Sequence, residues 1–212
     1  MNYIREALDN LIRGNARGLE AYLLEVCKNE YIDSTKAEMY IYMLRLDGNN
    51  RPRISDLASY ISCCIVEYCI PTEEIARAKK LDEEHNTTLY TMKLYKKAEG
   101  LFTNLQNTGE GGELLLSIMT QSVLKIPQVL CKMPLKTNSQ VHYHGADGLY
   151  GKYDEETKKF CLYWGESKLY SNVDEALSKC FDSIKPLLIE EGATGSQRER
   201  DLTLFRDNID FN

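Results

Sequence analysis

The feature that most constrains the fold is the order of hydrophobic patterns in the second half of the sequence. In residues 107–124, "NTGEGGELLLSIMTQSVL", a glycine-rich turn leads into a helix that starts at about Gly111, is apolar on nearly all sides and is therefore expected to be buried. Three strand-like segments follow at 126–133, 141–153 and 160–170, and an amphipathic helix at 173–191 comes after them. This order predicts a small sheet flanked by helices.

The first hundred residues favour helices. Residues 3–29 and 54–70 carry apolar side chains at helical spacing, and Ser55 is the expected N-cap of the second segment. Further helices are expected after Pro71 and at 89–102. Residues 31–53 fit a helix or a strand equally well.

The predicted fold class is therefore α+β. We expect a helical N-terminal region at 1–106, which would offer a docking surface for a partner, packed on a small mixed sheet flanked by helices at 107–212.

Composition narrows the class of protein. The hydrophobic share of 43% and the charged share of 27% are ordinary for a globular chain, and the net charge of −6 argues against strong unaided binding to nucleic acid. Seven cysteines without a repeated C-x-x-C pair indicate buried, reduced thiols. The apolar run at 57–70 is too short to span a bilayer, and the charged N-terminal segment is unlike a secretory signal. We expect a cytoplasmic protein.

The pattern Glu-x-Lys occurs twice, and its surroundings separate the two copies. Glu156 and Lys158 lie in a hairpin turn rich in charges, where solvation explains them. Glu166 and Lys168 come at the end of an apolar strand, where burying a charge is unfavourable unless a partner or a metal compensates it. The alternation of a strand is expected to point both side chains to one side of the sheet.

Two further acids support a site at Glu166. Asp147 lies on the preceding strand, and Glu113 opens the buried helix, with Glu110 as the reserve candidate. Oxygen ligands from Glu113, Asp147 and Glu166 would suit Mg²⁺ or Mn²⁺. A metal there would polarise a phosphoryl oxygen, and Lys168 would orient or deprotonate a water or stabilise charge on the phosphate. This is the chemistry of phosphodiester hydrolysis.

The same combination resembles a known family. An acid on a helix, then Asp, then Glu-x-Lys on consecutive strands, then a helix, is similar to the core order of PD-(D/E)XK nucleases. More narrowly, "GEGGELLL", "HGADGLYG" and "LYWGESKLY", after "ISDLASYISCCIVEYCIP", resemble the HamA family, the AbpA-like nuclease subunits of Hachiman antiphage defence systems. The likeness covers roughly residues 57–185, and the string around "GESKLY" is its most specific part.

The resemblance implies a restriction-endonuclease-like sheet, the helicase HamB as partner, and cleavage of DNA during phage infection. It also implies the catalytic positions, which are Glu113, Asp147, Glu166 and Lys168. The chain departs from the superfamily in two places. Ala146 stands where the superfamily name has proline, and the strand that usually follows the last core helix has no clear counterpart unless 201–212 supplies it.

Other readings remain open. The "GEGGE" turn lacks the spacing of a nucleotide-binding loop. His142, His144 and Asp147 spell H-x-H-x-x-D and could nominally hold zinc, while the remaining histidine, His85, lies in an acidic segment. A non-catalytic binding or scaffold subunit of a helicase complex fits the acidic charge equally well. Convergence of the candidate side chains would separate the nuclease from the scaffold.

Overall fold

The computed structural model describes residues 2–13, 16–102, 109–131, 133, 146–189 and 196–208 of the chain. It divides into two compact units. The smaller unit comprises Asn15–Cys63, and the larger comprises Met1–Gly14 together with Cys64–Asn212. Helices that follow residue 64 therefore belong to the same unit as the sheet, so the division by compactness differs from the predicted boundary after residue 106.

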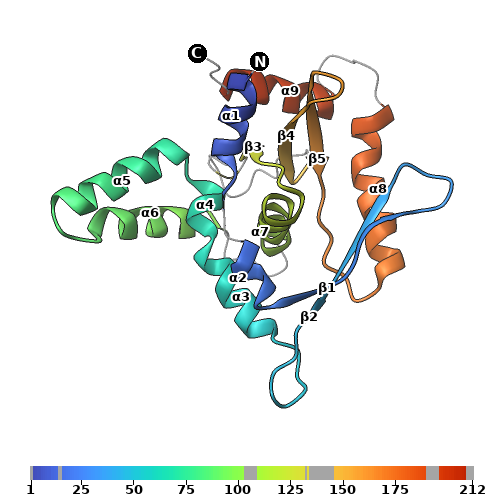
Figure 1. Ribbon diagram of the computed structural model, residues 1–212, viewed down its shortest axis with the longest axis horizontal. Coiled ribbons are helices and arrows are strands. Elements are labelled where there is room, and N and C mark those ends of the chain that lie inside the picture. Colours follow the sequence, from blue (N-terminus) through green and yellow to red (C-terminus); the bar gives the residue numbers. More distant parts are fainter. Residues whose placement is uncertain are drawn as a thin grey trace. The chain divides into compact units, whose positions relative to one another are not determined.

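The smaller unit is built around a β-hairpin. Strand β1 (Leu23–Tyr31) pairs antiparallel with β2 (Glu38–Leu44), and the short helix α2 (Ala16–Glu20) precedes them (Figure 1). The helical prediction was therefore wrong for residues 23–29, and the undecided segment at 31–53 contributes a strand. The apolar residues of β1 fit a helical period as well as a strand period over so short a stretch, and pairing with β2 decides between them.

The predicted buried helix at 54–70 is two helices. Helix α3 (Ile54–Cys63) ends the smaller unit and has no buried residue, whereas α4 (Ile65–Cys69) belongs to the larger unit and is buried at four of its five positions. A turn at Cys64 separates them. Since α3 begins at Ile54, Ser55 lies inside the first turn and is not the N-cap that we predicted.

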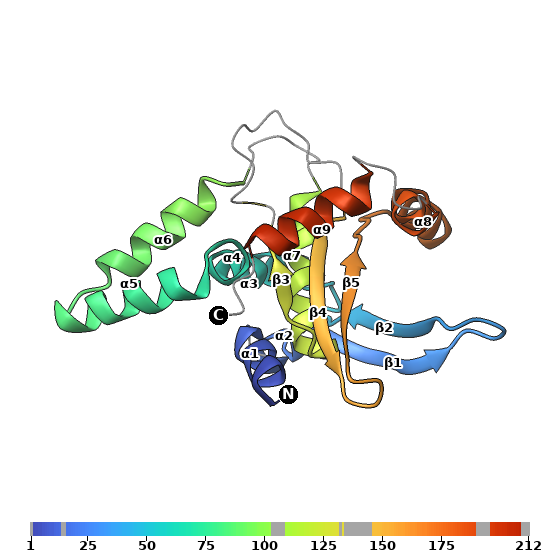
Figure 2. The same cartoon turned by 90° about the horizontal axis from the view of Figure 1, so that it is seen from above.

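The predicted helices after Pro71 and at 89–102 are confirmed as α5 (Thr72–Glu84) and α6 (Leu89–Glu99), which lie side by side in both views (Figures 1 and 2). The Asp82 carboxylate joins them, because it accepts the backbone N–H groups of Tyr90 and Thr91 at 2.8 and 2.9 Å. These are N–H groups of the first turn of α6, which have no partner within the helix itself. The larger unit also contains the N-terminal helix α1 (Asn2–Leu11).

The sheet of the larger unit is antiparallel. Its strands β3 (Gln128–Leu130), β4 (Gly148–Asp154) and β5 (Lys159–Gly165) lie in the order β3-β4-β5. Each of the three predicted segments contains a strand, so these predictions are confirmed. Strand β5 ends five residues earlier than expected, and residues 141–145 lie outside the described part. We predicted a mixed sheet, and the described strands pair only antiparallel.

The expected buried helix is α7 (Glu110–Met119), which continues into a π-helical turn at Thr120–Leu124. Leu114 and Ile118 on α7 are buried, as are Leu149 and Tyr150 on β4. Helix and strand meet closely at Gly165, where an added Cβ would lie 2.8 Å from the Tyr150 ring and 3.0 Å from Leu116. Part of the core of the larger unit therefore lies between α7 and the sheet.

Two helices follow the sheet. Helix α8 (Val173–Ile189) follows β5 along the chain, and Asn172 caps it by accepting the backbone N–H of Glu175 at 2.9 Å, the spacing of a capping box (Figure 1). The last element, α9 (Gln197–Asn208), is a helix. Residues 201–208 therefore do not form the further strand that the superfamily core would require.

The α+β class is confirmed. All seven cysteines lie in the described part and are free thiols, as predicted, but only Cys69 is buried. Within the described residues, no helix has the length and apolar character needed to cross a membrane.

Candidate active site

The candidate site lies at the end of the sheet where β4 begins and β5 ends. Gly148 pairs with Gly165, and the backbone N–H of Asp147 donates to the Gly165 carbonyl at 2.9 Å. Asp147 therefore comes immediately before one strand and Glu166 immediately after its partner. An antiparallel hairpin brings these two positions to the same edge, although they are distant in sequence.

Ser167 joins the two strand ends. Its backbone N–H donates to Asp147 Oδ2 at 2.7 Å, and its hydroxyl donates to the same oxygen at 2.9 Å. Hydrogen bonds to an ionised carboxylate are stronger than neutral ones. They fix the carboxylate of Asp147 beside the Glu166–Lys168 segment.

Glu166 and Lys168 form an ion pair between Lys168 Nζ and Glu166 Oε1, and their side chains are only 9% and 24% exposed. The strand ends at Gly165, so the prediction that both residues belong to β5 was wrong. They meet because residues 166–170 form no regular secondary structure, so the two side chains are free of the strand alternation. The carbonyl oxygen of Glu166 also lies 4.0 Å from Cys180 Sγ on α8. Both charges are therefore partly buried and compensated by each other.

Lys168 carries the positive charge of this site. Burial alone would lower the pKa of its amine, but the hydrogen bond and charge of Glu166, together with the charge of Asp147, raise that pKa overall. A raised amine pKa keeps Lys168 protonated at neutral pH. The two carboxylates and one ammonium therefore act on one another in one place.

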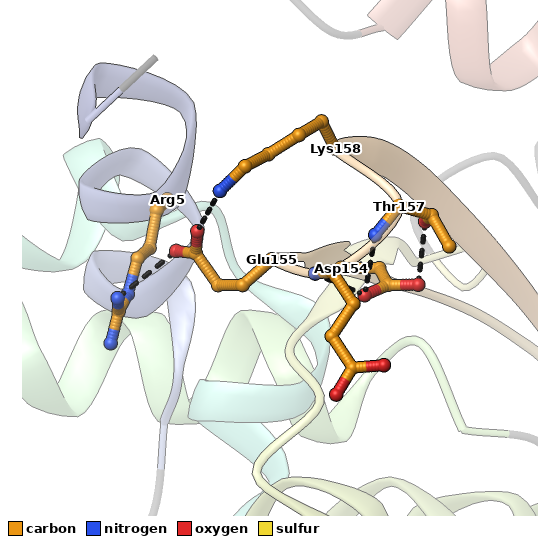
Figure 3. A network of polar contacts seen from close by, with 6 residues as sticks. Arg5, Asp154, Glu155, Thr157 and Lys158 are labelled. Atoms are coloured by element: carbon orange, nitrogen blue, oxygen red, sulfur yellow. Dashed lines mark hydrogen bonds and ion pairs between the residues drawn. The ribbon is translucent and has the colours of Figure 1, made fainter.

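The second Glu-x-Lys copy differs, as predicted from its surroundings. In the turn between β4 and β5, Lys158 pairs with Glu155 at 3.1 Å, and Glu155 pairs with Arg5 of α1 at 3.0 Å (Figure 3). All three side chains are more than half exposed. Such surface pairs contribute little to stability, so this copy is a solvated turn.

The first turn of α7 adjoins the same segment. A Cβ added to Gly112 would lie 3.0 Å from Ser167 Oγ and 3.2 Å from Leu169 Cγ. The helix begins after Gly109, whose φ of +79° suits glycine. Since α7 starts at Glu110, both Glu110 and Glu113 lie inside the helix, and the position of Glu113 within it no longer distinguishes the two.

Glu113 is directed toward a tyrosine. The hydroxyl of Tyr68 on α4 donates to Glu113 Oε2 at 3.4 Å, a long hydrogen bond. Burial, followed by the charges of its neighbours, raises the pKa of Tyr68, so its hydroxyl keeps its proton at neutral pH. Glu110 is the more buried of the two acids, at 5% exposure.

The donor set can be compared with the needs of a metal ion. Among the described residues, no three His, Cys, Asp or Glu side chains are arranged so that they could hold a metal together. Asp147 and Glu166 carry oxygen donors of the kind that Mg²⁺ prefers, and proteins often hold this ion through one or two carboxylates with water and substrate phosphate completing the shell. A contribution of Glu113 to the same ion stays a prediction. His142 and His144 lie outside the described residues.

Sequence reasoning missed three residues of this site. Ser167 stood between the two charges and could have been noticed as a hydroxyl beside a carboxylate pair. Gly112 could have been read as a point of close approach within "GEGGE". Tyr68 carries no local signal that connects it with Glu113, because 45 residues separate them along the chain.

A family model described as HamA matches residues 20–212, which is nearly the whole chain. No curated protein and no solved structure matches the chain.

Proposed function

The chain belongs to the HamA family, whose members are subunits of Hachiman antiviral defence systems, and from this premise we propose that it is a metal-dependent deoxyribonuclease working with a helicase partner. One observation carries the proposal. Asp147, Glu166 and Lys168, from two strand ends, gather at one edge of the sheet with their charges partly buried. Partly buried charged clusters of this kind are typical of functional sites.

The carboxylates of Asp147 and Glu166 are the proposed ligands of Mg²⁺ or Mn²⁺. Glu113 on the adjoining helix, whose carboxylate accepts the Tyr68 hydroxyl in this structure, would turn toward the ion as the third acid. When bound, the metal would polarise a phosphoryl oxygen and lower the pKa of the attacking water. Asp147 would present Oδ1 to the ion, because both of its hydrogen bonds from Ser167 go to Oδ2.

Lys168 has a distinct role in this proposal. Its amine stays protonated beside Glu166 and Asp147, so it acts as a cation rather than as a base. A fixed cation stabilises the negative charge that develops on a phosphate during cleavage. Lys168 would release Glu166 and turn toward the substrate phosphate when DNA and metal enter.

Dependence on a helicase partner is supported by the family and by charge. The net charge of −6 gives this chain little general attraction for DNA, since affinity for a phosphate backbone comes from lysine and arginine. A helicase subunit, which is HamB in the Hachiman systems that this chain resembles, would supply that affinity and deliver the DNA strand to this chain. This chain would then supply the cutting site.

The test uses the chain in complex with its helicase partner, on plasmid and linear DNA with Mg²⁺ or EDTA. Glu166→Ala and Lys168→Ala are each expected to lower the cleavage rate at least about 100-fold, the usual loss when a group that stabilises the transition state is removed. Glu156→Ala and Lys158→Ala are matched controls from the exposed copy of the same pattern and are expected to cleave normally.

Two results would contradict the nuclease. Full cleavage by Glu166→Ala and Lys168→Ala in intact complexes would show that these residues do not form the catalytic site. The absence of any Mg²⁺-dependent cleavage by the wild-type complex would favour the scaffold subunit. In the scaffold case the ion pair would be structural, and Glu166→Ala would lower the melting temperature without changing any activity of the complex.

A further inference from the structure

We propose that Ser167 is a positioning residue that holds the Asp147 carboxylate for the cation and is itself held by the first turn of α7. The proposal rests on the proposed function and deepens it. The hydroxyl of Ser167 would contact neither substrate nor metal, and its effect would pass through Asp147.

The first step of the argument is the pair of hydrogen bonds. Backbone N–H and hydroxyl of Ser167 both donate to Asp147 Oδ2, at 2.7 and 2.9 Å. Two donors restrict the place of one oxygen more tightly than a single donor does, and neither of these two bonds uses Oδ1. An aspartate has two side-chain torsions, so without the hydroxyl the backbone N–H of Ser167 would restrain the carboxylate less tightly.

The second step is the location of Ser167 between the two charged residues of the ion pair. Glu166 Oε1 and Lys168 Nζ form that ion pair, and Ser167 is the residue between them in the chain. Its two hydrogen bonds to Asp147 therefore hold another carboxylate next to the segment that carries the pair. Like charges repel, and the donors at Ser167 offset that repulsion while the ammonium of Lys168 compensates it.

The third step is the contact with α7. Gly112 leaves room for Ser167 Oγ, since an added Cβ would approach it to 3.0 Å. The neighbouring Gly111 has nothing within 4 Å of the same added atom. The hydroxyl of Ser167 thus lies between the Asp147 carboxylate and the helix that carries Glu113, which makes Ser167 the point where three elements of the site meet.

The experiment measures Mn²⁺ binding to the full chain by isothermal titration calorimetry, with the melting temperature in EDTA recorded for each variant. Ser167→Ala is expected to raise the Kd for Mn²⁺ about 10-fold, the lower end of the usual loss when a residue that orients a ligand is removed. Its melting temperature is expected to stay close to that of the control Ser171→Ala, an exposed serine four residues further on.

A second pair of variants tests the contact with α7. Gly112→Ala is expected to weaken Mn²⁺ binding several-fold by displacing Ser167 Oγ, whereas Gly111→Ala is expected to bind like the wild type. Both substitutions replace glycine by alanine within α7 and raise helix propensity equally, so this effect cancels when the two variants are compared. Equal Kd values in these two variants would overturn the part of the proposal that concerns α7.

The outcomes separate this inference from the proposed function. A wild-type chain that binds no Mn²⁺ would overturn both. If the wild type binds Mn²⁺ and Glu166→Ala does not, an unchanged Kd in Ser167→Ala would overturn the role of Ser167 alone, whether or not its melting temperature falls. If Ser167→Ala does not fold, Ser167→Cys keeps a side chain of similar size with only a weak donor, and it must show the same loss of Mn²⁺ affinity.

Discussion

The β1–β2 and β4–β5 hairpins, which the structure describes, have similar lengths but differ in burial and regularity. In β4–β5 the register runs without a shift from one end to the other, and Leu149 and Tyr150 are buried at 0% and 2% exposure. In β1–β2 the register shifts twice, and apolar side chains such as Met43, at 58% exposure, face solvent. One hairpin is held by the core and the other by local contacts.

The β1–β2 hairpin relies on polar contacts along its other face. Tyr42 donates to Glu25 at 2.9 Å and Tyr40 donates to Asn29 at 2.6 Å, between exposed or half-buried side chains. Burial, followed by the hydrogen bond to Glu25, raises the pKa of Tyr42 to about 12. Such contacts can support a hairpin, but they do not fix a residue to the accuracy that a catalytic site needs. The candidate site accordingly lies at the end of the regular, buried hairpin.

The largest expected effect comes from removing the packing of the buried hairpin. Leu149→Ala is expected to lower the free energy of unfolding by about 2–5 kcal/mol, because it leaves a cavity in the core. Met43→Ala is expected to change it by less than about 0.5 kcal/mol, because the side chain is exposed. Urea unfolding followed by circular dichroism measures both, and fluorescence of Trp164 on β5 reports on the larger unit.

A large loss in Met43→Ala would break the comparison, since it would mean that β2 is covered in solution. A small loss in Leu149→Ala would mean that the sheet is less tightly packed than its burial implies.

A smaller effect is expected from filling space beside a strand. A Cβ at Gly151 would lie 2.6 Å from Phe160, whose ring stacks on Phe205 at 5.8 Å between centroids, and 2.9 Å from Val129. Gly151→Ala is therefore expected to cost about 1–3 kcal/mol, the usual range for overpacking. Gly48→Ala, which meets nothing within 4 Å, is the control and is expected to be neutral within about 0.5 kcal/mol. The same urea titration measures both, and equal costs would contradict the close packing of β4.

The smallest effect is a difference in pH dependence between the two turns. Asp154 accepts the Thr157 hydroxyl at 2.6 Å and the Glu156 N–H at 2.9 Å, and these bonds lower its pKa. In the unfolded chain the pKa of an aspartate is about 3.9, and in the folded chain the pKa of Asp154 is lower. The ionised carboxylate therefore stabilises the fold fully above the unfolded pKa, and this stabilisation is lost as the pH falls through the folded pKa. Asp154→Ala should therefore lower the melting temperature at pH 7 and have progressively less effect below pH 4.

The β1–β2 turn is the control for this prediction. Its bonds run from the Thr35 hydroxyl to the Ile32 carbonyl at 2.8 Å and from the Ala37 N–H to Thr35 at 3.0 Å, and neither involves an ionisable group. Thr35→Ala should lower stability equally at pH 7 and pH 3 when scanning calorimetry compares it with the wild type. A pH-independent loss in Asp154→Ala would show that its carboxylate does not hold the turn as a charged acceptor.

Local patterns were sufficient where one period dominated a long segment. The helices α5, α6 and α8 follow from apolar spacing, with Pro71 marking the start of α5, and the three strands of the sheet follow from strand-forming runs between turns. Prediction failed at β1 because its apolar residues fit two periods. It also failed at Cys64, where a continuous apolar run gave no sign of the break between α3 and α4.

The candidate site was likewise predictable only as far as local sequence patterns reach. The contrast between a solvated and an apolar context distinguished Glu166 and Lys168 from Glu156 and Lys158, and the ion pairs agree with that contrast. The hydrogen bond from the Ser167 hydroxyl to Asp147 was not predictable, because it depends on the register between two strand ends.

The amino-acid sequence alone determined the α+β class, the order of elements around the sheet, and which charged residues stand in apolar surroundings. Hydrophobic period and local charge suffice for these properties, since they act within a few residues. Only the tertiary structure decided that β5 ends before Glu166, that Ser167 holds Asp147, and that Gly112 admits Ser167 beside α7. Those contacts join segments far apart along the chain, and their geometry follows from pairing and packing across the whole unit.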